Sequence, residues 1–173
     1  MKTYLEFHRR SIEDREGFWS EQAKLVHWHK PPSRILDYGR PPFARWFGGG
    51  ETNLCYNAVD RHLASRSEQR ALVYISTETG EEKAFSYRDL YAEVQRAAAM
   101  MRSLGVGRGD RVIIYMPMIP EAVFVILACA RIGAIHSVVF GGFAAASLAA
   151  RIDDARPKLM VTADGGSRLG KAV

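Results

Sequence analysis

Three short apolar runs, 111–116 (RVIIYM), 134–139 (AIHSVV) and 158–162 (KLMVT), decide the fold of this chain. Each is rich in β-branched and aliphatic residues and has the length of a strand. Their starts lie 23 and 24 residues apart, which leaves room for one helix in each interval. Strands that alternate with helices in this way are typical of βαβ crossovers. The runs therefore predict an α/β fold with a parallel sheet.

Both intervals carry helical signals. The first helix is expected to begin at Pro120, because proline is tolerated in a first turn, and to end at Gly133. Its residues are apolar on nearly every side, which predicts deep burial. The second helix places Leu148 and Ile152 on one face and is expected to end before Pro157.

A hairpin and a third helix are expected before the sheet. The runs 71–75 and 81–85 read as two strands joined by a glycine-containing turn. Ser86 then stands at an N-cap position with Asp89 three residues on, a weak form of the capping box. Apolar residues at helical spacing follow, and Gly105 is expected to close this helix.

The first part of the chain differs from the rest in composition and in its lack of regular alternation. We assign residues 1–65 to an irregular or helical arm and residues 66–173 to the first part of the larger domain. Residues 1–29 can hold short helices, but proline pairs at 31–32 and 41–42 impose extended chain before them. The arm is rich in aromatic residues with too little local sequence to build a core. We therefore expect it to pack against a larger body.

Composition excludes several classes of protein. The 173 residues contain 24 Lys and Arg against 19 Asp and Glu, and the charged runs are short and mixed, so nucleic acid binding is not expected. Cys55 and Cys129 give neither a disulfide framework nor metal-ligand spacing. No signal peptide is recognisable, and no apolar run approaches the ~20 residues of a membrane span. These features predict a cytoplasmic protein without membrane contact.

The first candidate site follows the second strand of the predicted sheet. Ligands of open α/β sheets gather beyond the carboxyl ends of the strands. There, Gly141 and Gly142 would expose backbone N–H groups with no side chain in the way, just before a helix N-terminus. The alternative is a tight strand-to-helix turn that needs glycine only for its positive φ. The sequence leaves both interpretations open.

The second candidate site follows the third strand, in the glycine-rich stretch 163–171. Arg168 and Lys171 are three residues apart, and on the first turn of a helix they would project to one side. Two cations beside exposed amides suit a phosphate group. The alternative is an ordinary basic turn on the surface, with Asp164 as a simple cap.

Other site motifs are missing from the sequence. No G-x-G-x-x-G follows a strand and no G-x-x-x-x-G-K-[ST] is present, which argues against a dinucleotide site and a P-loop. The histidines and serines cannot be assembled into a triad from sequence order. We predict no catalytic residue and no metal site in this segment.

A family resemblance rests on two stretches. Residues 117–143 resemble the amino-terminal domain of the AMP-forming short-chain acyl-CoA synthetases of the adenylate-forming family, and residues 53–63 resemble the segment that precedes that domain. The run 35–47 looks more like the propionate-activating members than the acetate-activating members. The resemblance covers essentially the whole chain.

The resemblance implies a two-step reaction. A short-chain carboxylate, here propionate, attacks ATP to give an acyl-adenylate and diphosphate, and coenzyme A then displaces AMP. It also implies that Gly141, Gly142, Arg168 and Lys171 lie along the coenzyme A path. Many relatives have arginine in place of Lys171, and lysine lacks the planar fork that contacts phosphate with two bonds.

The resemblance also implies that the ATP and Mg sites and the catalytic lysine lie beyond residue 173. The chain would then be an inactive fragment whose partner is the remainder of its own polypeptide. Three alternatives stay open at this stage: an acetate–CoA ligase fragment, a stand-alone flavodoxin-like module that binds coenzyme A or a phosphate without catalysis, and a partner-docking piece.

Overall fold

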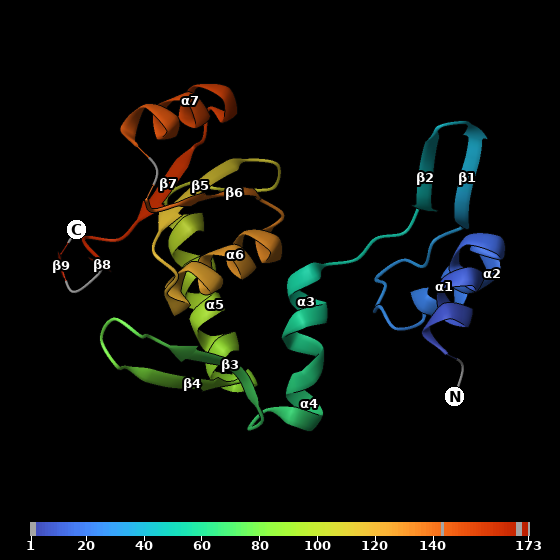
Figure 1. Ribbon diagram of the computed structural model, residues 1–173, viewed down its shortest axis with the longest axis horizontal. Helices are drawn as coiled ribbons and strands as arrows, with labels where there is room; N and C mark the ends of the chain where they lie inside the picture. The colour runs from blue at the N-terminus through green and yellow to red at the C-terminus, as the bar shows by residue number, and fades with distance from the viewer. Residues whose placement is uncertain (1–2, 143, 169–170, 173) are drawn as a thin grey trace. The chain divides into compact units, whose positions relative to one another are not determined.

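The computed structural model describes residues 3–142, 144–168 and 171–172, with only the backbone of 167–168 and 171–172 (Figure 1). The chain forms two compact units, Met1–Asn53 and Leu54–Val173, each of which is considered by itself. The boundary expected from the sequence lay after residue 65.

The first unit contains two helices and a hairpin. Helix α1 (Tyr4–Glu13) begins with a capping box, in which Thr3 and Glu6 bond to each other's backbone N–H. Helix α2 is Arg15–Ala23. The short helices predicted before residue 29 are therefore confirmed. Strands β1 (Arg34–Arg40) and β2 (Phe43–Gly48) pair antiparallel, a hairpin that the sequence analysis did not predict.

Aromatic side chains of the first unit pack on one another. Phe18 is only 2% exposed and meets Phe7 edge-on at 4.7 Å between ring centroids. Trp19 contacts Phe18 at 5.2 Å and reaches the hairpin through Trp46 at 5.7 Å. Trp19 and Trp46 nevertheless stay 36% and 41% exposed, so these contacts leave much of the rings uncovered.

The second unit opens with helical turns and a hairpin. These are α3 (Leu54–Ala58), η1 (Asp60–His62), α4 (Leu63–Arg66), β3 (Arg70–Ile75) and β4 (Glu82–Ser86). Strands β3 and β4 pair antiparallel, as predicted. Helix α5 (Tyr87–Ser103) begins at the predicted capping box, in which Ser86 and Asp89 bond to each other's backbone N–H. Gly105, with φ +82°, follows its C-cap.

The parallel sheet is confirmed. Strands β5 (Arg111–Met116), β6 (Ile135–Phe140) and β7 (Leu159–Thr162) lie in the order β6-β5-β7. Helix α6 (Pro120–Ile132) connects β5 to β6, and α7 (Ala145–Ala155) connects β6 to β7. Because β6 and β7 flank β5 on opposite sides, right-handed crossovers place α6 and α7 on opposite faces of the sheet. Figure 1 shows this arrangement.

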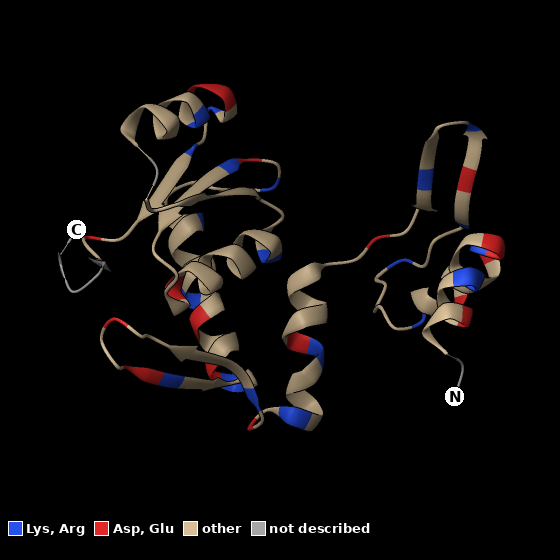
Figure 2. Cartoon of the chain, viewed as in Figure 1, with Lys and Arg blue, Asp and Glu red and all other residues tan. Residues whose placement is uncertain are grey.

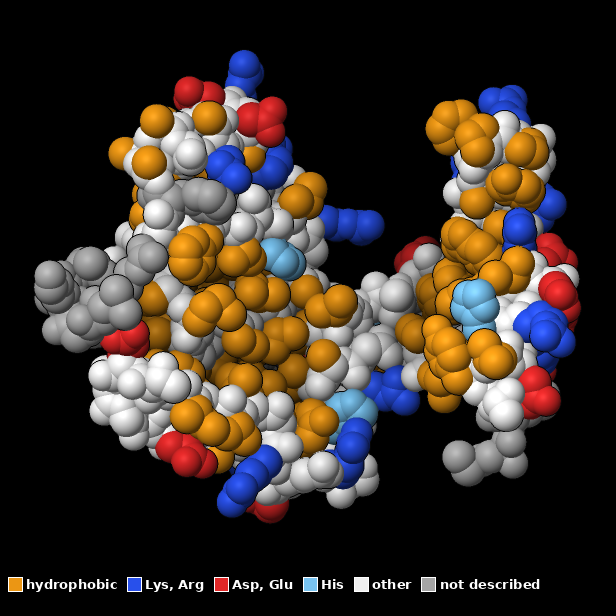
Figure 3. Space-filling model, viewed as in Figure 1, with side chains coloured by type: hydrophobic (Ala, Val, Ile, Leu, Met, Phe, Trp, Pro, Cys, Tyr) orange, Lys and Arg blue, Asp and Glu red, His pale blue; other side chains and the backbone are white. Residues whose placement is uncertain are grey.

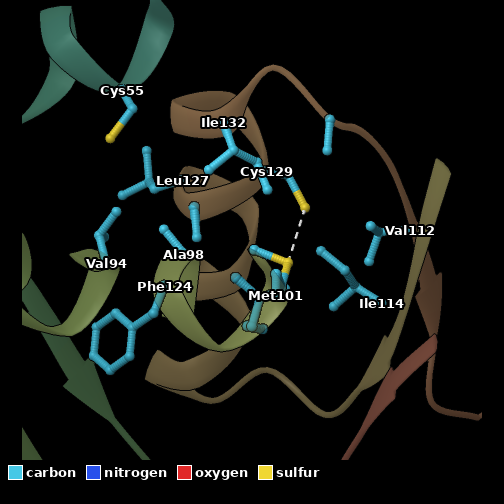
Figure 4. Close-up of a cluster of buried hydrophobic side chains, with 14 of the residues drawn as sticks. Cys55, Val94, Ala98, Met101, Val112, Ile114, Phe124, Leu127, Cys129 and Ile132 are labelled. Atoms are coloured by element: carbon cyan, nitrogen blue, oxygen red, sulfur yellow. Dashed lines mark hydrogen bonds between the residues drawn. The ribbon is translucent and has the colours of Figure 1, made fainter. Parts of the chain in front are cut away.

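The main core lies between α5, α6 and one face of the sheet (Figure 4). Val112 and Ile114 of β5 belong to this core together with Val94 and Met101 of α5. Cys129 of α6 is fully buried, with its Sγ 3.8 Å from Sδ of Met101. Burial raises the pKa of this thiol from 9.0 to about 11, so it behaves as an apolar core residue.

Strand β6 is an edge strand that leaves large apolar side chains on the surface. Ile135, Val138 and Phe140 are half or more exposed, and Met118 after β5 is 78% exposed. Figure 3 shows hydrophobic side chains gathered over the middle of the second unit. Positions of positive and negative residues are interspersed along the ribbon of this unit (Figure 2).

Candidate ligand site at the carboxyl edge of the sheet

A cavity of about 490 Å³ opens at the carboxyl edge of the parallel sheet. All three strand ends contribute to its wall. Its lining residues are Tyr115, Met116, Pro117 and Met118 after β5, Phe140, Gly141 and Gly142 after β6, and Thr162, Ala163, Asp164, Gly165 and Gly166 after β7. The two exit loops that the sequence analysis singled out therefore meet at one cavity.

The topology explains why the cavity forms here. The exit loop of β5 leads into α6 on one face of the sheet, and the exit loop of the neighbouring strand β6 leads into α7 on the other face, so these two loops diverge. The diverging loops leave a crevice at this switch point, where α/β proteins commonly bind ligands. The strand order, which the sequence did not predict, is what opens the space.

Gly141 lies at the inner wall of the cavity. Its φ is outside the left-handed region, so the turn does not need glycine for a positive φ. A Cβ at this position would lie 3.5 Å from the backbone of Met116, an ordinary contact distance. The tight-turn alternative therefore does not account for a glycine at 141. The other interpretation, a backbone that a ligand can approach closely, stays a prediction.

Tyr115 fixes the backbone at this glycine. Its side chain comes from the penultimate position of the central strand, and its hydroxyl donates a hydrogen bond to the carbonyl oxygen of Gly141 at 3.1 Å. From the sequence, Tyr115 was predicted only as a strand residue. The sequence did contain a signal for this contact, because a tyrosine near the carboxyl end of a central strand can reach the neighbouring exit loop.

Arg168 and Lys171 do not lie on a helix, so the predicted helical turn is wrong. Their backbones form the two short strands β8 (Ser167–Arg168) and β9 (Lys171–Ala172), and the two residues pair directly with each other. Glycine disfavours helix, and this stretch has two glycines before it and one inside it, so the backbone is extended here. Their side chains lie outside the described residues, and their role in binding stays a prediction.

The described wall of the cavity is mostly apolar or glycine backbone. Asp164 is its one carboxylate, and the described lining residues include no lysine, arginine or histidine. The cations that would bind a phosphorylated ligand must therefore come from outside this lining. The β8–β9 segment, which follows Gly166, carries Arg168 and Lys171 in its sequence.

Two protein-family models match the chain. Residues 4–58 match the acetyl-coenzyme A synthetase N-terminus, and residues 59–172 match the AMP-binding enzyme model. The chain belongs to the AMP-binding enzyme family. The curated relatives of this AMP-binding enzyme include the propionate–CoA ligases of Salmonella typhimurium, 60% identical over 169 residues, and Escherichia coli, 58% identical over 171. An acetyl-coenzyme A synthetase of Streptomyces avermitilis is 51% identical over 166 residues.

The AMP-binding enzyme chain spans about a quarter of the length of these relatives. The matches cover 96–99% of the chain but 26–27% of each of the three proteins. Among solved structures, acetoacetyl-CoA synthetase from Streptomyces lividans superposes with a TM-score of 0.90 at 33% identity, over 99% of this chain and 27% of that one. The expected fold, that of the amino-terminal domain of an acyl-CoA synthetase, is confirmed.

Two features are absent from the described part of this AMP-binding enzyme. No group of three or more His, Cys, Asp and Glu side chains is placed to hold a metal ion there. The described helices also include none with the length and apolar character that crossing a bilayer requires.

Proposed function

We propose that this chain is the amino-terminal part of a short-chain acyl-CoA ligase that converts propionate, ATP and coenzyme A into propionyl-CoA, AMP and diphosphate. The single observation that carries the proposal is the match to propionate–CoA ligases at 58–60% identity over nearly the whole chain, against 51% for the acetyl-coenzyme A synthetase. The cytoplasmic location expected from the sequence stays a prediction.

The chemistry proceeds in two steps. A propionate oxygen attacks the α-phosphate of ATP, the bond to diphosphate breaks, and propionyl-adenylate forms. The coenzyme A thiol, after losing its proton, then attacks the activated carbonyl, and AMP leaves. The first step is needed because a carboxylate becomes a useful electrophile only once its oxygen is part of a good leaving group.

The carboxyl-edge cavity is the part of this chain that we assign to coenzyme A. Gly141 and Gly142 offer an uncovered backbone at its wall, and Arg168 and Lys171 follow the loop that forms its opposite side. Phosphate groups favour such a combination of loop amides and cations. We place no ATP or Mg site on this segment, and the residues that bind them belong to the rest of the ligase.

A chimeric ligase tests the proposal. Residues 1–173 replace the matching segment of the Salmonella typhimurium propionate–CoA ligase, which the chain matches over 169 residues. We expect propionate-dependent exchange of diphosphate into ATP and formation of propionyl-CoA, with neither activity from the 173-residue chain alone. A chimera that folds but makes no propionyl-CoA would refute the assignment.

The choice of acid needs a separate comparison, because acetyl-coenzyme A synthetases are also close relatives. The full-length ligase that carries this segment natively should show a higher kcat/KM for propionate than for acetate. A preference for acetate would replace propionate in the proposal and leave the reaction type unchanged.

A further inference from the structure

Tyr115 stands beside the proposed coenzyme A site in a position that its role in the sheet does not explain. Its neighbour Ile113 on the same face of β5 is fully buried by packing, whereas the Tyr115 side chain is only half-buried and ends at the cavity wall. Its hydroxyl bonds across to the adjacent exit loop, at the Gly141 carbonyl oxygen. The contact joins the central strand to the loop that carries the glycines.

The bond to the Gly141 carbonyl also determines the direction of a donor. The Gly141 carbonyl and the Gly142 N–H belong to one peptide unit, which is planar and trans, so the N–H points opposite to the carbonyl. Holding the carbonyl at 3.1 Å from the Tyr115 hydroxyl therefore fixes the line along which the Gly142 N–H points. Without that bond, a glycine pair has wide backbone freedom, and the peptide plane can rotate.

The Gly142 N–H has no acceptor among the described residues. It makes no hydrogen bond to another described residue, and Gly142 lies in the cavity wall. A fixed, uncommitted backbone donor costs less to order on binding than a mobile one, because its conformational entropy is already lost. The pair Tyr115–Gly141 is therefore suited to prepare the loop before a ligand arrives.

We propose that Tyr115 is a positioning residue for coenzyme A, which acts through its hydroxyl on the Gly141–Gly142 peptide and holds the Gly142 N–H as a fixed donor. The inference rests on the proposed function, since it concerns the second half-reaction of that ligase. It predicts that the hydroxyl matters when coenzyme A binds and is irrelevant to the formation of the adenylate.

The test uses Tyr115→Phe in the chimeric ligase, because phenylalanine keeps the ring and removes only the hydroxyl. We expect the KM for coenzyme A to rise roughly fivefold, the size of one lost neutral hydrogen bond. Propionate-dependent exchange of diphosphate into ATP, measured without coenzyme A, should stay unchanged, and the melting temperature should fall only slightly, because one hydrogen bond within the protein is lost. The matched control is Tyr74→Phe, a half-buried tyrosine on β3 away from the cavity, which should change none of these quantities.

Three outcomes would contradict the inference. A KM for coenzyme A equal to that of the unsubstituted chimera would show that the hydroxyl does not position the loop. Parallel losses in exchange, KM and melting temperature would show that Tyr115 only supports the fold. If the unsubstituted chimera shows neither exchange nor thioester formation, the proposed function itself fails, and this inference falls with it.

Discussion

Nη2 of Arg131 lies 2.6 Å from Oδ2 of Asp60, and this ion pair joins helix α6 to the turn η1. Both side chains are only 17% exposed. The guanidinium also stacks over the ring of Tyr91 on α5, 5.1 Å from its centroid. One cation therefore ties three elements of the second unit together, well away from the carboxyl-edge cavity.

Breaking this pair should destabilise the second unit. Arg131→Met leaves the Asp60 carboxylate largely buried without its partner, and we expect a loss of about 2–3 kcal/mol, near the lower limit for buried pairs because some water still reaches it. Urea unfolding of the 173-residue chain measures the loss. The control is Arg88→Met, whose pair with Glu68 is exposed and should contribute less than about 1 kcal/mol. Equal losses for the two variants would contradict the structural role of the Asp60–Arg131 pair.

Gly141→Ala should separate binding from folding. Because Gly141 has an ordinary φ and room for a Cβ, alanine should change the free energy of unfolding by less than about 1 kcal/mol. In the chimeric ligase the added methyl group should nevertheless raise the KM for coenzyme A, since it covers the exposed backbone.

Gly133→Ala provides the opposite control for this comparison. Gly133 ends α6 at φ +75°, and a Cβ there would meet the Arg108 side chain at 3.1 Å. The Gly133→Ala variant should lose about 1–2 kcal/mol of stability. Its KM for coenzyme A should not change. A large loss of stability in Gly141→Ala would instead favour the tight-turn interpretation of that glycine.

Arg168→Ala and Lys171→Ala should weaken coenzyme A binding in a salt-dependent way. If each cation meets a phosphate, its removal should raise the KM for coenzyme A roughly tenfold at low ionic strength and less at high ionic strength. The exposed Arg96→Ala on α5 is the charge-matched control and should leave the KM unchanged. Dephospho-coenzyme A serves as a second probe. A variant whose defect shrinks with that ligand must contact the 3′-phosphate, whereas two variants indistinguishable from Arg96→Ala would remove both residues from the proposed site.

The stability of the second unit should fall in alkaline solution because of Cys129. Burial raises its pKa from 9.0 to about 11, so the folded state keeps the proton longer than the unfolded chain does. Stability from this group is thus complete below pH 9 and declines as the pH rises from about 9 toward 11. Comparing urea midpoints of the wild type and Cys129→Ala over this range isolates the thiol. Identical pH dependence in the two proteins would contradict the assignment.

Local signals made most of the second unit predictable from sequence. Ser86 and Asp89 marked the start of α5, and Pro120 and Gly133 bounded α6, because capping and proline geometry act within a few residues. The three strands were located to within one residue of their starts. Such features depend on near neighbours alone.

Features that depend on distant pairing were not predictable. The β1–β2 hairpin joins two runs with weak alternation and prolines between them, and tertiary contacts such as that of Trp19 with Trp46 help to stabilise it. For the candidate site, the sequence identified both exit loops but not their common cavity, which requires the strand order. The extended pairing of Arg168 with Lys171 and the reach of Tyr115 to Gly141 likewise depend on tertiary structure.

The strand order β6-β5-β7 also bears on how the segment is made on the ribosome. Strand β5 emerges first, but its second neighbour, β7, is complete only at Thr162. A nascent chain that ends before that residue can form the α5–α6 core and pair β5 with β6, yet one flank of β5 is still unpaired. The cavity that we propose for coenzyme A should therefore appear late in synthesis, after the core that supports it, and truncated translation products should be folded in part but lack this cavity.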